Sequence, residues 1–209
     1  LVGVRIPEQP SGRSVAVVGG GPAGLACAIQ LLGKGHNVTI FEKSDRLGGT
    51  PDCIIPADRY QEATAEVDSI LQPAIRAGRL EIRFRYALGE DISLKELRDR
   101  YHAVFLGLGL SKATSLGIAE GVFDALTFLQ QAKRGRISSM GPTVAVLGGG
   151  NTAIDAAVTA KRLGARDVYV IYRRSLTEMP AWPGERKRLT EAGCHLLILT
   201  QPVGYETDG

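Results

Sequence analysis

Short, wholly apolar runs alternate along the chain with longer segments in which apolar residues recur at helical spacing. Such runs are typical of strands buried on both faces of a parallel sheet. The predicted strands are 15–18, 38–41, 80–84, 103–106, 144–147, 168–172 and 196–200. The predicted helices are 23–32, 60–77, 94–100, 122–133, 151–163 and 185–192, and 45–56 is predicted to be a loop.

The strand–helix–strand order occurs twice, once near the start of the chain and once after a predicted linker at 135–142. A duplicated unit of this kind predicts an α/β fold with two Rossmann-like dinucleotide-binding domains. We expect them to span 1–112 and 113–209. We also expect the first to be incomplete and the second to be truncated at its C-terminal end.

The first predicted strand runs directly into the pattern Gly19-x-Gly21-x-x-Gly24. Gly19 allows the tight turn, Gly21 allows a pyrophosphate to approach the backbone, and Gly24 allows the helix to pack close to the sheet. Pro22 and Ala23 begin the helix, whose free N–H groups and dipole favour phosphate. The pattern therefore predicts a dinucleotide site.

Glu42 ends the second predicted strand of this unit, and Lys43 follows it. A carboxylate at this position can accept hydrogen bonds from ribose hydroxyls, and it repels a 2′-phosphate. The first site is therefore predicted to bind FAD or NAD(H) and to reject NADP(H).

The second fingerprint is Gly148-x-Gly150-x-x-Ala153, in which alanine replaces the third glycine. Alanine is still small enough for close packing of helix and strand. Asn151 is placed where it could cap the helix, and Thr152 follows it. This turn is predicted to be a second dinucleotide site.

The second unit differs most from the first where its second strand ends, at Tyr172, Arg173 and Arg174. A guanidinium can bind a phosphate in a bidentate manner. Charge-assisted hydrogen bonds of this kind predict a preference for NADPH over NADH of about 10- to 150-fold. An arginine pair in solvent is the plainer alternative.

The composition excludes several classes of function. The 209 residues include 44% hydrophobic and 22% charged residues, and the net charge of +3 is too small to indicate nucleic-acid binding. No apolar run is long enough to span a membrane. Cys27, Cys53 and Cys194 are too few and too far apart for a disulfide framework, which favours a reducing, cytoplasmic location. No metal site and no catalytic side chain is predicted.

Several longer motifs resemble one family. Residues 41–49, Phe-Glu-Lys-Ser-Asp-Arg-Leu-Gly-Gly, are similar to the glutathione-reductase-like pyridine nucleotide-disulfide oxidoreductases. The resemblance implies that FAD occupies the first site, with Glu42 on its ribose and with Gly48 and Gly49 letting the chain run close to the flavin side.

Ile55-Pro-Ala-Asp-Arg59 resembles an element of the branch that holds the small subunit of bacterial glutamate synthase and the NADPH-oxidising part of dihydropyrimidine dehydrogenase. This resemblance adds Arg59 to the first site. The segments 148–155 and 172–181 look like the NADPH domain of the same branch. Residues 104–109 are closer to the dihydropyrimidine dehydrogenases, so the choice between the two relatives stays open.

The resemblance implies an FAD-containing NADPH oxidoreductase that passes hydride from NADPH to FAD and electrons to an iron–sulfur domain or partner subunit. In this family the last segment of the FAD domain returns after the NADPH domain, so we expect the chain to be a piece of a longer protein. The alternatives are an electron-input subunit of the dihydropyrimidine dehydrogenase type, a thioredoxin-reductase-like enzyme without its dithiol, and a non-catalytic dinucleotide-binding fragment.

Overall fold

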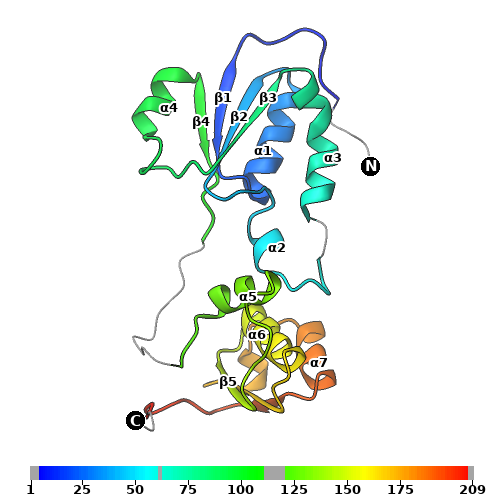
Figure 1. Ribbon diagram of the computed structural model, residues 1–209, viewed down its shortest axis with the longest axis vertical. Coiled ribbons are helices and arrows are strands. Elements are labelled where there is room, and N and C mark those ends of the chain that lie inside the picture. The colour runs from blue at the N-terminus through cyan, green and yellow to red at the C-terminus, as the bar shows by residue number, and fades with distance from the viewer. Residues whose placement is uncertain (1–4, 61–62, 111–120, 207–209) are drawn as a thin grey trace. The chain divides into compact units, whose positions relative to one another are not determined.

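The computed structural model describes residues 5–60, 63–110 and 121–206. The chain forms two compact units, one made of 1–53 with 58–110 and the other of 54–57 with 111–209. Each unit is an α/β layer structure with a parallel sheet, which confirms the predicted fold class (Figure 1). The division after residue 110 lies close to the domain boundary expected after residue 112.

The first unit contains a four-stranded sheet in the order β3-β2-β1-β4, in which all neighbours run parallel. Val18 pairs with Phe41 on one side and with Leu106 on the other, so the strands end at one common edge of the sheet. The strands are β1 (Ser14–Val18), β2 (Asn37–Glu42), β3 (Leu80–Phe84) and β4 (Ala103–Leu106).

Helices cover both faces of the first sheet (Figure 1). On one face, Leu32 and Leu71 pack against Val17 and Ile40. On the other, Leu97 packs with Phe41, whose ring also makes edge contacts with two tyrosines. The helices of this unit are α1 (Pro22–Gly33), α2 (Thr50–Cys53), α3 (Ala63–Arg76) and α4 (Leu94–Arg100).

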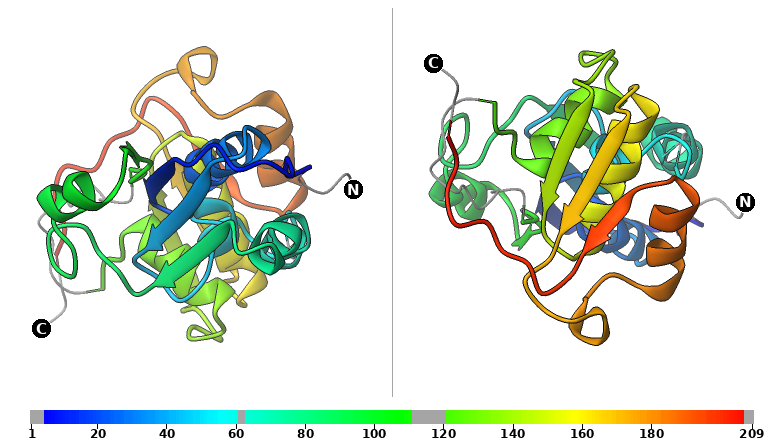
Figure 2. Two further views of the ribbon diagram at one scale, coloured as in Figure 1. Left: turned by 90° about the horizontal axis from the view of Figure 1, so that it is seen from above. Right: turned by 90° about the horizontal axis from the view of Figure 1, so that it is seen from below.

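The second unit contains a three-stranded parallel sheet in the order β5-β6-β7, seen from below in Figure 2. Ile154 of its central helix is fully buried against Val168 and Val170 of the sheet. The strands are β5 (Thr143–Leu147), β6 (Asp167–Ile171) and β7 (His195–Leu197). The helices are α5 (Ala125–Lys133), α6 (Asn151–Arg162) and α7 (Pro183–Glu191), with a 3-10 turn η1 (Leu176–Glu178).

Four predicted segments differ from the structure. The predicted loop 45–56 contains α2. Helix α5 begins at Ala125 and not at 122, because the Asp124 carboxylate accepts hydrogen bonds from the N–H groups of Leu126 and Thr127 and caps the helix. Strand β7 ends at Leu197, before Leu199 turns into left-handed backbone. Residues 135–142 connect α5 to β5 inside the second unit and do not link the units.

Candidate functional site

The first glycine-rich turn leaves β1 through Gly19, which has a φ of 104°. The Gly19 N–H donates to the Phe41 carbonyl over 2.8 Å and so holds the turn against β2. A Cβ added at Gly19 would overlap the carbonyl of Gly107, the residue that follows β4. Gly19 is therefore required both by its backbone conformation and by the neighbouring chain.

Gly24 and Gly21 have different reasons to be glycine. A Cβ at Gly24 would overlap the carbonyl of Gly19, so helix α1 lies directly against the turn. A Cβ at Gly21 would meet only the Cα of Gly49, at 3.7 Å, which is ordinary contact. Protein packing thus does not explain Gly21. Pro22 and Ala23, which begin α1 next to Gly21, are exposed.

Gly48 and Gly49 lie against this turn. The Gly48 N–H donates to the Gly20 carbonyl over 2.9 Å. Gly49 has a φ of 60°, and a Cβ there would come within 2.8 Å of the Gly21 Cα. The Gly-Gly pair therefore brings the chain after β2 back to the start of α1.

Glu42 is 7% exposed, and both of its carboxylate oxygens accept backbone hydrogen bonds. Oε2 accepts from Gly20 N–H at 2.6 Å, and Oε1 accepts from Ser44 N–H at 2.8 Å. A Cβ at Gly20 would lie 3.1 Å from Oε2 and 2.5 Å from a methyl of Leu47. Gly20 is therefore a residue of the candidate site that the fingerprint does not include, and the run of three glycines was the signal for it.

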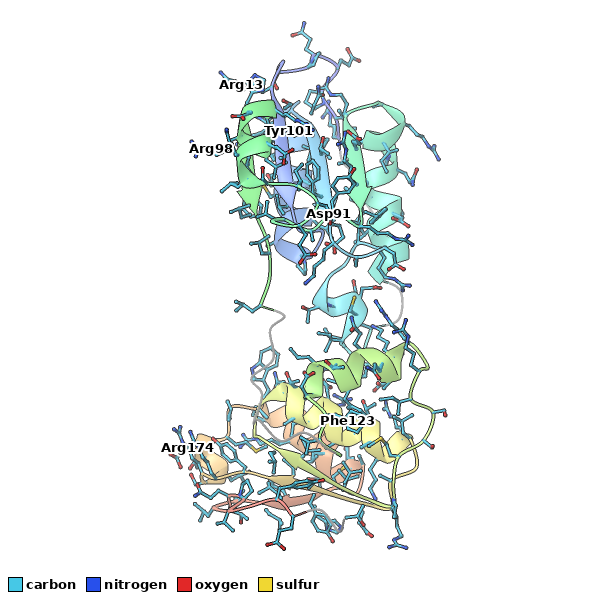
Figure 3. The ribbon with its side chains drawn as sticks, turned by 60° about the vertical axis from the view of Figure 1, so that its left-hand side comes forward. Arg13, Asp91, Arg98, Tyr101, Phe123 and Arg174 are labelled. Carbon is cyan, nitrogen blue, oxygen red and sulfur yellow. The ribbon has the colours of Figure 1, made fainter. Side chains whose placement is uncertain are left out.

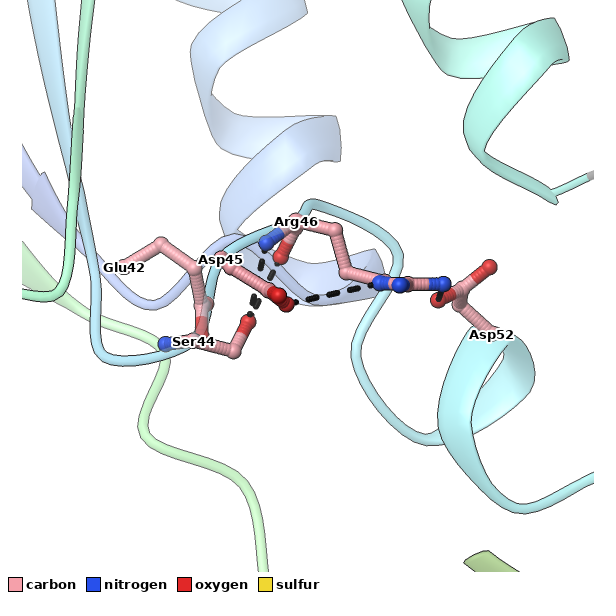
Figure 4. A network of polar contacts seen from close by, with 5 residues as sticks. All are labelled: Glu42, Ser44, Asp45, Arg46 and Asp52. Carbon is pink, nitrogen blue, oxygen red and sulfur yellow. Dashed lines mark hydrogen bonds and ion pairs between the residues drawn. The ribbon is translucent and has the colours of Figure 1, made fainter. Parts of the chain in front are cut away.

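A chain of polar contacts continues from Glu42 to α2 (Figure 4). The Ser44 hydroxyl donates to the Arg46 carbonyl over 2.7 Å. The Arg46 guanidinium lies 3.4 Å from the Asp45 carboxylate and 3.8 Å from that of Asp52 in α2. These contacts shape the loop between β2 and α2. Lys43 is exposed beside them, and Arg59 is exposed in the turn that follows α2.

The second turn repeats the first in backbone. Gly148 has a φ of 139°, and its N–H donates to the Ile171 carbonyl over 3.0 Å, as Gly19 does to Phe41. A Cβ at Gly148 would lie 3.5 Å from the Cβ of Ala153, so this turn has room for alanine. A Cβ at Gly150 would meet nothing within 4 Å, which again leaves space for a ligand.

The expectation that Asn151 caps α6 is wrong. The N-cap residue is Gly150, and no side chain caps this helix. The Asn151 Oδ1 instead accepts a hydrogen bond from the Trp182 N–H over 3.0 Å. Thr152 is exposed in the first turn of the helix. Asn151 therefore joins the start of α6 to the segment before α7.

Tyr172 occupies the place that Glu42 holds in the first unit, because β6 pairs with β5 in the same register as β2 with β1. Its ring covers Gly149, where a Cβ would come within 2.5 Å of the ring. Its hydroxyl donates to the Glu178 carbonyl over 2.9 Å. Gly149, like Gly20, is a residue of the candidate site that sequence reasoning missed.

Arg173 and Arg174 are both exposed at the end of β6, and Figure 3 shows Arg174 at the surface of the second unit. The Arg174 carbonyl accepts a hydrogen bond from Leu199 N–H at 3.1 Å, which fixes its backbone. Hydrogen bonds from Ser175 to the Glu178 carboxylate, aided by the charge of Arg174, lower the pKa of Glu178. The two guanidinium groups thus sit on an ordered turn.

Helices α6 and α7 are joined by a buried ionic cluster. The Arg188 guanidinium lies 2.7 Å from the Glu185 carboxylate and 3.3 Å from that of Asp155. Burial opposes the charge of Arg188, but the bonds from both carboxylates outweigh it and raise the arginine pKa. This cluster fixes α7 on α6 and so positions the segment that leads into α7.

The three cysteines, Cys27, Cys53 and Cys194, are free. Burial raises the pKa of the Cys27 and Cys194 thiols, which makes both poor nucleophiles. Within residues 5–60, 63–110 and 121–206, no group of metal-ligating side chains gathers. In the same ranges, no helix has the length and apolar character needed to cross a bilayer.

Curated proteins with related sequences support the resemblance to glutamate synthase. The glutamate synthase [NADPH] small chain of Escherichia coli is 34% identical over an alignment of 216 positions, which covers 96% of this chain and 45% of that protein. Subunit beta of the NADP(+)-dependent formate dehydrogenase of Moorella thermoacetica is 38% identical over 202 residues, 92% of this chain and 28% of that one. The chain thus spans less than half the length of either relative.

Among solved structures, FprA of Mycobacterium tuberculosis in complex with NADPH has a TM-score of 0.70 at 20% identity, over 88% of this chain and 48% of that one. This likeness shows a shared fold. The family model for pyridine nucleotide-disulphide oxidoreductases matches residues 13–209, which include both glycine-rich turns. The chain is therefore a member of the pyridine nucleotide-disulphide oxidoreductase family.

Proposed function

We propose that the chain is the cofactor-binding part of an NADPH-dependent flavoprotein oxidoreductase, with FAD at the first turn and NADPH at the second. The observation that carries the proposal is a difference between the two units at one register position: the first unit has Glu42 there and the second has Tyr172. A buried carboxylate at the first turn rejects a 2′-phosphate, whereas the second turn has no carboxylate there and is followed by two exposed arginines.

The residues present fit both cofactors. At Gly21 and Gly150 an added Cβ would point into space that the protein does not fill, at the N-terminus of a helix, where a pyrophosphate is stabilised. Glu42 keeps lone pairs for ribose hydroxyls, since a carboxylate can accept about four hydrogen bonds. The proposed contacts of the first site are Gly19, Gly21, Pro22, Ala23, Gly24, Glu42, Lys43, Gly48, Gly49 and Arg59.

The proposed contacts of the second site are Gly148, Gly150, Asn151, Thr152, Ala153, Arg173 and Arg174. When bound, the two cofactors would supply hydride transfer from reduced nicotinamide to flavin. The chain would bind and orient them and would supply no nucleophile. The relatives named as NADPH- and NADP(+)-dependent subunits support this assignment.

We further propose that electrons leave the flavin for an iron–sulfur domain or partner subunit, as in an electron-input subunit. Two relatives carry the names of a small chain and of a subunit beta, which supports a partner. A thioredoxin-reductase-like activity is less well supported, because the partly buried thiols of Cys27 and Cys194 have raised pKa values. The free cysteines are in keeping with a reducing, cytoplasmic compartment.

Anaerobic reduction tests the proposal. The chain is supplemented with FAD, and flavin bleaching is followed after addition of NADPH or NADH. We expect bleaching with NADPH to be faster by about 10- to 150-fold, and R173A/R174A to remove this preference. Equal rates for the two nucleotides in the wild type would refute the assignment of the arginines. Nucleotide binding without bleaching would favour a non-catalytic binding fragment.

A further inference from the structure

Two residues other than glycine, Arg85 and Leu199, have left-handed backbone, with φ angles of 60° and 53°. No other non-glycine residue within 5–60, 63–110 and 121–206 has a positive φ. A side chain is strained in this conformation because its Cβ crowds the following carbonyl oxygen. Strained residues of this kind gather at ligand sites, so their place in the fold is informative.

The two strained residues occupy equivalent places in the two units. Arg85 comes directly after β3, and Leu199 follows β7. Each lies two residues beyond the strand residue that pairs with the neighbour of Glu42 or of Tyr172. These pairs are Phe41 with Arg83 and Ile171 with Leu197. The repeat of the two units therefore includes the strained position itself.

Backbone hydrogen bonds hold Leu199 beside the arginine pair. Its N–H donates to the carbonyl of Arg174, and the N–H of Thr200 donates to that of Tyr172, each over 3.1 Å. The matching bonds of the first unit run from Arg85 to Ser44 and from Tyr86 to Glu42, each over 3.0 Å. In both units the strained residue thus lies at the end of the second strand, where the adenosine ribose is proposed to bind.

The Leu199 side chain gains little burial in its own unit to offset the strain. It is 72% exposed, and Arg85 is exposed as well. Glycine would adopt the same left-handed backbone without strain and would make the same backbone hydrogen bonds. A large apolar side chain that is kept here, in solvent and on strained backbone, points to a contact with a ligand.

We propose that Leu199 forms an apolar contact with the adenine of the nucleotide at the second turn, an inference that rests on the proposed function. The adenine is joined to the ribose that carries the 2′-phosphate, and this phosphate is proposed to bind Arg173 and Arg174. FAD and NADPH differ in their reactive halves and share the adenosine half, which agrees with a position that both units repeat. Partial burial of a leucine side chain under the base contributes about 3- to 10-fold in affinity.

Calorimetric titration of the full chain tests the contact. L199A is expected to weaken the binding of NADP⁺ and of adenosine 2′,5′-bisphosphate by the same factor of about 3- to 10-fold, and L199M to retain most of the affinity. The control is V203A, because Val203 is a fully exposed apolar residue of the same unit. A loss of affinity for NADP⁺ alone would overturn the assignment to the adenosine half. Unchanged affinity in L199A overturns the inference alone, whereas a wild type that binds no NADP⁺ overturns the proposed function with it.

A second variant separates ligand contact from a role in folding. L199G removes the side chain and the strain together, so the melting temperature should stay the same or rise by up to a few degrees. The affinity for both adenosine ligands should nevertheless fall as far as in L199A. If stability and affinity fell together in L199G, the leucine would serve the fold of the second unit, and the proposal would be wrong.

Discussion

The two glycine-rich turns share a backbone and differ in the side chain that closes the second strand of each unit. In the first, the Glu42 carboxylate accepts a hydrogen bond from Gly20 N–H. In the second, the Tyr172 ring lies over Gly149 at the equivalent position. The middle glycine of each triple therefore makes room for a neighbouring side chain, which is a carboxylate in the first unit and a neutral ring in the second.

The turns also differ in how tightly the helix is packed. A Cβ at Gly24 would overlap the Gly19 carbonyl, and Gly107 encloses the same place from β4. The equivalent residue of the second turn, Ala153, already carries a Cβ, which fits at 3.5 Å from one built on Gly148. The two turns thus share a motif, but at its third conserved position the first turn requires glycine and the second accepts alanine.

The largest expected effect on stability comes from replacing Gly24 by alanine, and it can be compared with the replacement of Ala153 by glycine. G24A forces backbone atoms apart, and we expect it to reduce the free energy of unfolding of the first unit by about 3 kcal/mol or more. A153G removes a fitting methyl group and should cost only about 1 kcal/mol. Urea unfolding measures both. Circular dichroism reports on the whole chain and Trp182 fluorescence on the second unit.

The matched control for G24A is G33A, near the other end of α1. A Cβ at Gly33 would meet nothing within 4 Å, so alanine should leave stability unchanged or raise it by about 0.5 to 1 kcal/mol. If G24A were as stable as G33A, the close packing of turn and helix would be disproved.

A second, smaller effect is expected at Glu42. E42Q keeps the shape of the side chain but turns an amide toward one of two backbone N–H donors, so one charge-assisted hydrogen bond is lost. We expect a cost of about 1.5 to 3 kcal/mol to the first unit, from the same unfolding experiment. E81Q is the control, because the Glu81–Arg83 pair is exposed and should contribute less than about 1 kcal/mol. An equal cost for both would contradict the structural role of Glu42.

Much of the fold could be predicted because apolar runs and helical spacing are local properties. The pattern placed the first strand at 15–18, and β1 spans Ser14–Val18. It missed α2, since a four-residue helix that contains Pro51 and follows two glycines has the composition of a loop. The Cys53 N–H donates to the Gly49 carbonyl and closes this turn, a bond that no periodicity indicates.

The candidate site was predictable only as far as it depends on motif spacing. Gly20 and Gly149 were missed because their need for glycine comes from side chains more than twenty residues away: Leu47 and Glu42, after and at the end of β2, and Tyr172 after β6. The role of Asn151 was predicted wrongly for a similar reason. Helix capping depends on residues close in sequence. The actual partner of Asn151 is Trp182, which the packing of α7 on α6 brings close.

The charge at the end of the second strand can be tested by placing a carboxylate at the second turn, as in the first. Y172E places a carboxylate beside the proposed 2′-phosphate site, and we expect the preference for NADP⁺ over NAD⁺ to fall about tenfold, or about 1.4 kcal/mol. Calorimetric titration with both nucleotides measures the ratio. Y172F, which removes only the hydroxyl bond to Glu178, should keep the preference. An unchanged ratio in Y172E would show that charge at this position does not select the nucleotide.

The smallest expected effect concerns the turn that carries the arginines. Hydrogen bonds from Ser175 lower the pKa of Glu178, so the folded value lies below the value of about 4.3 for an unfolded glutamate. The stabilisation from this carboxylate is thus complete above that value and is lost as the pH falls through the lower, folded pKa. E178Q should flatten the acid part of the melting-temperature profile that lies below this unfolded value, with a change of no more than a few degrees. E191Q, at an exposed pair with Lys187 in the same unit, is the control. A wild-type profile that matches E178Q throughout would mean that the bonds from Ser175 do not stabilise the turn beneath Arg174.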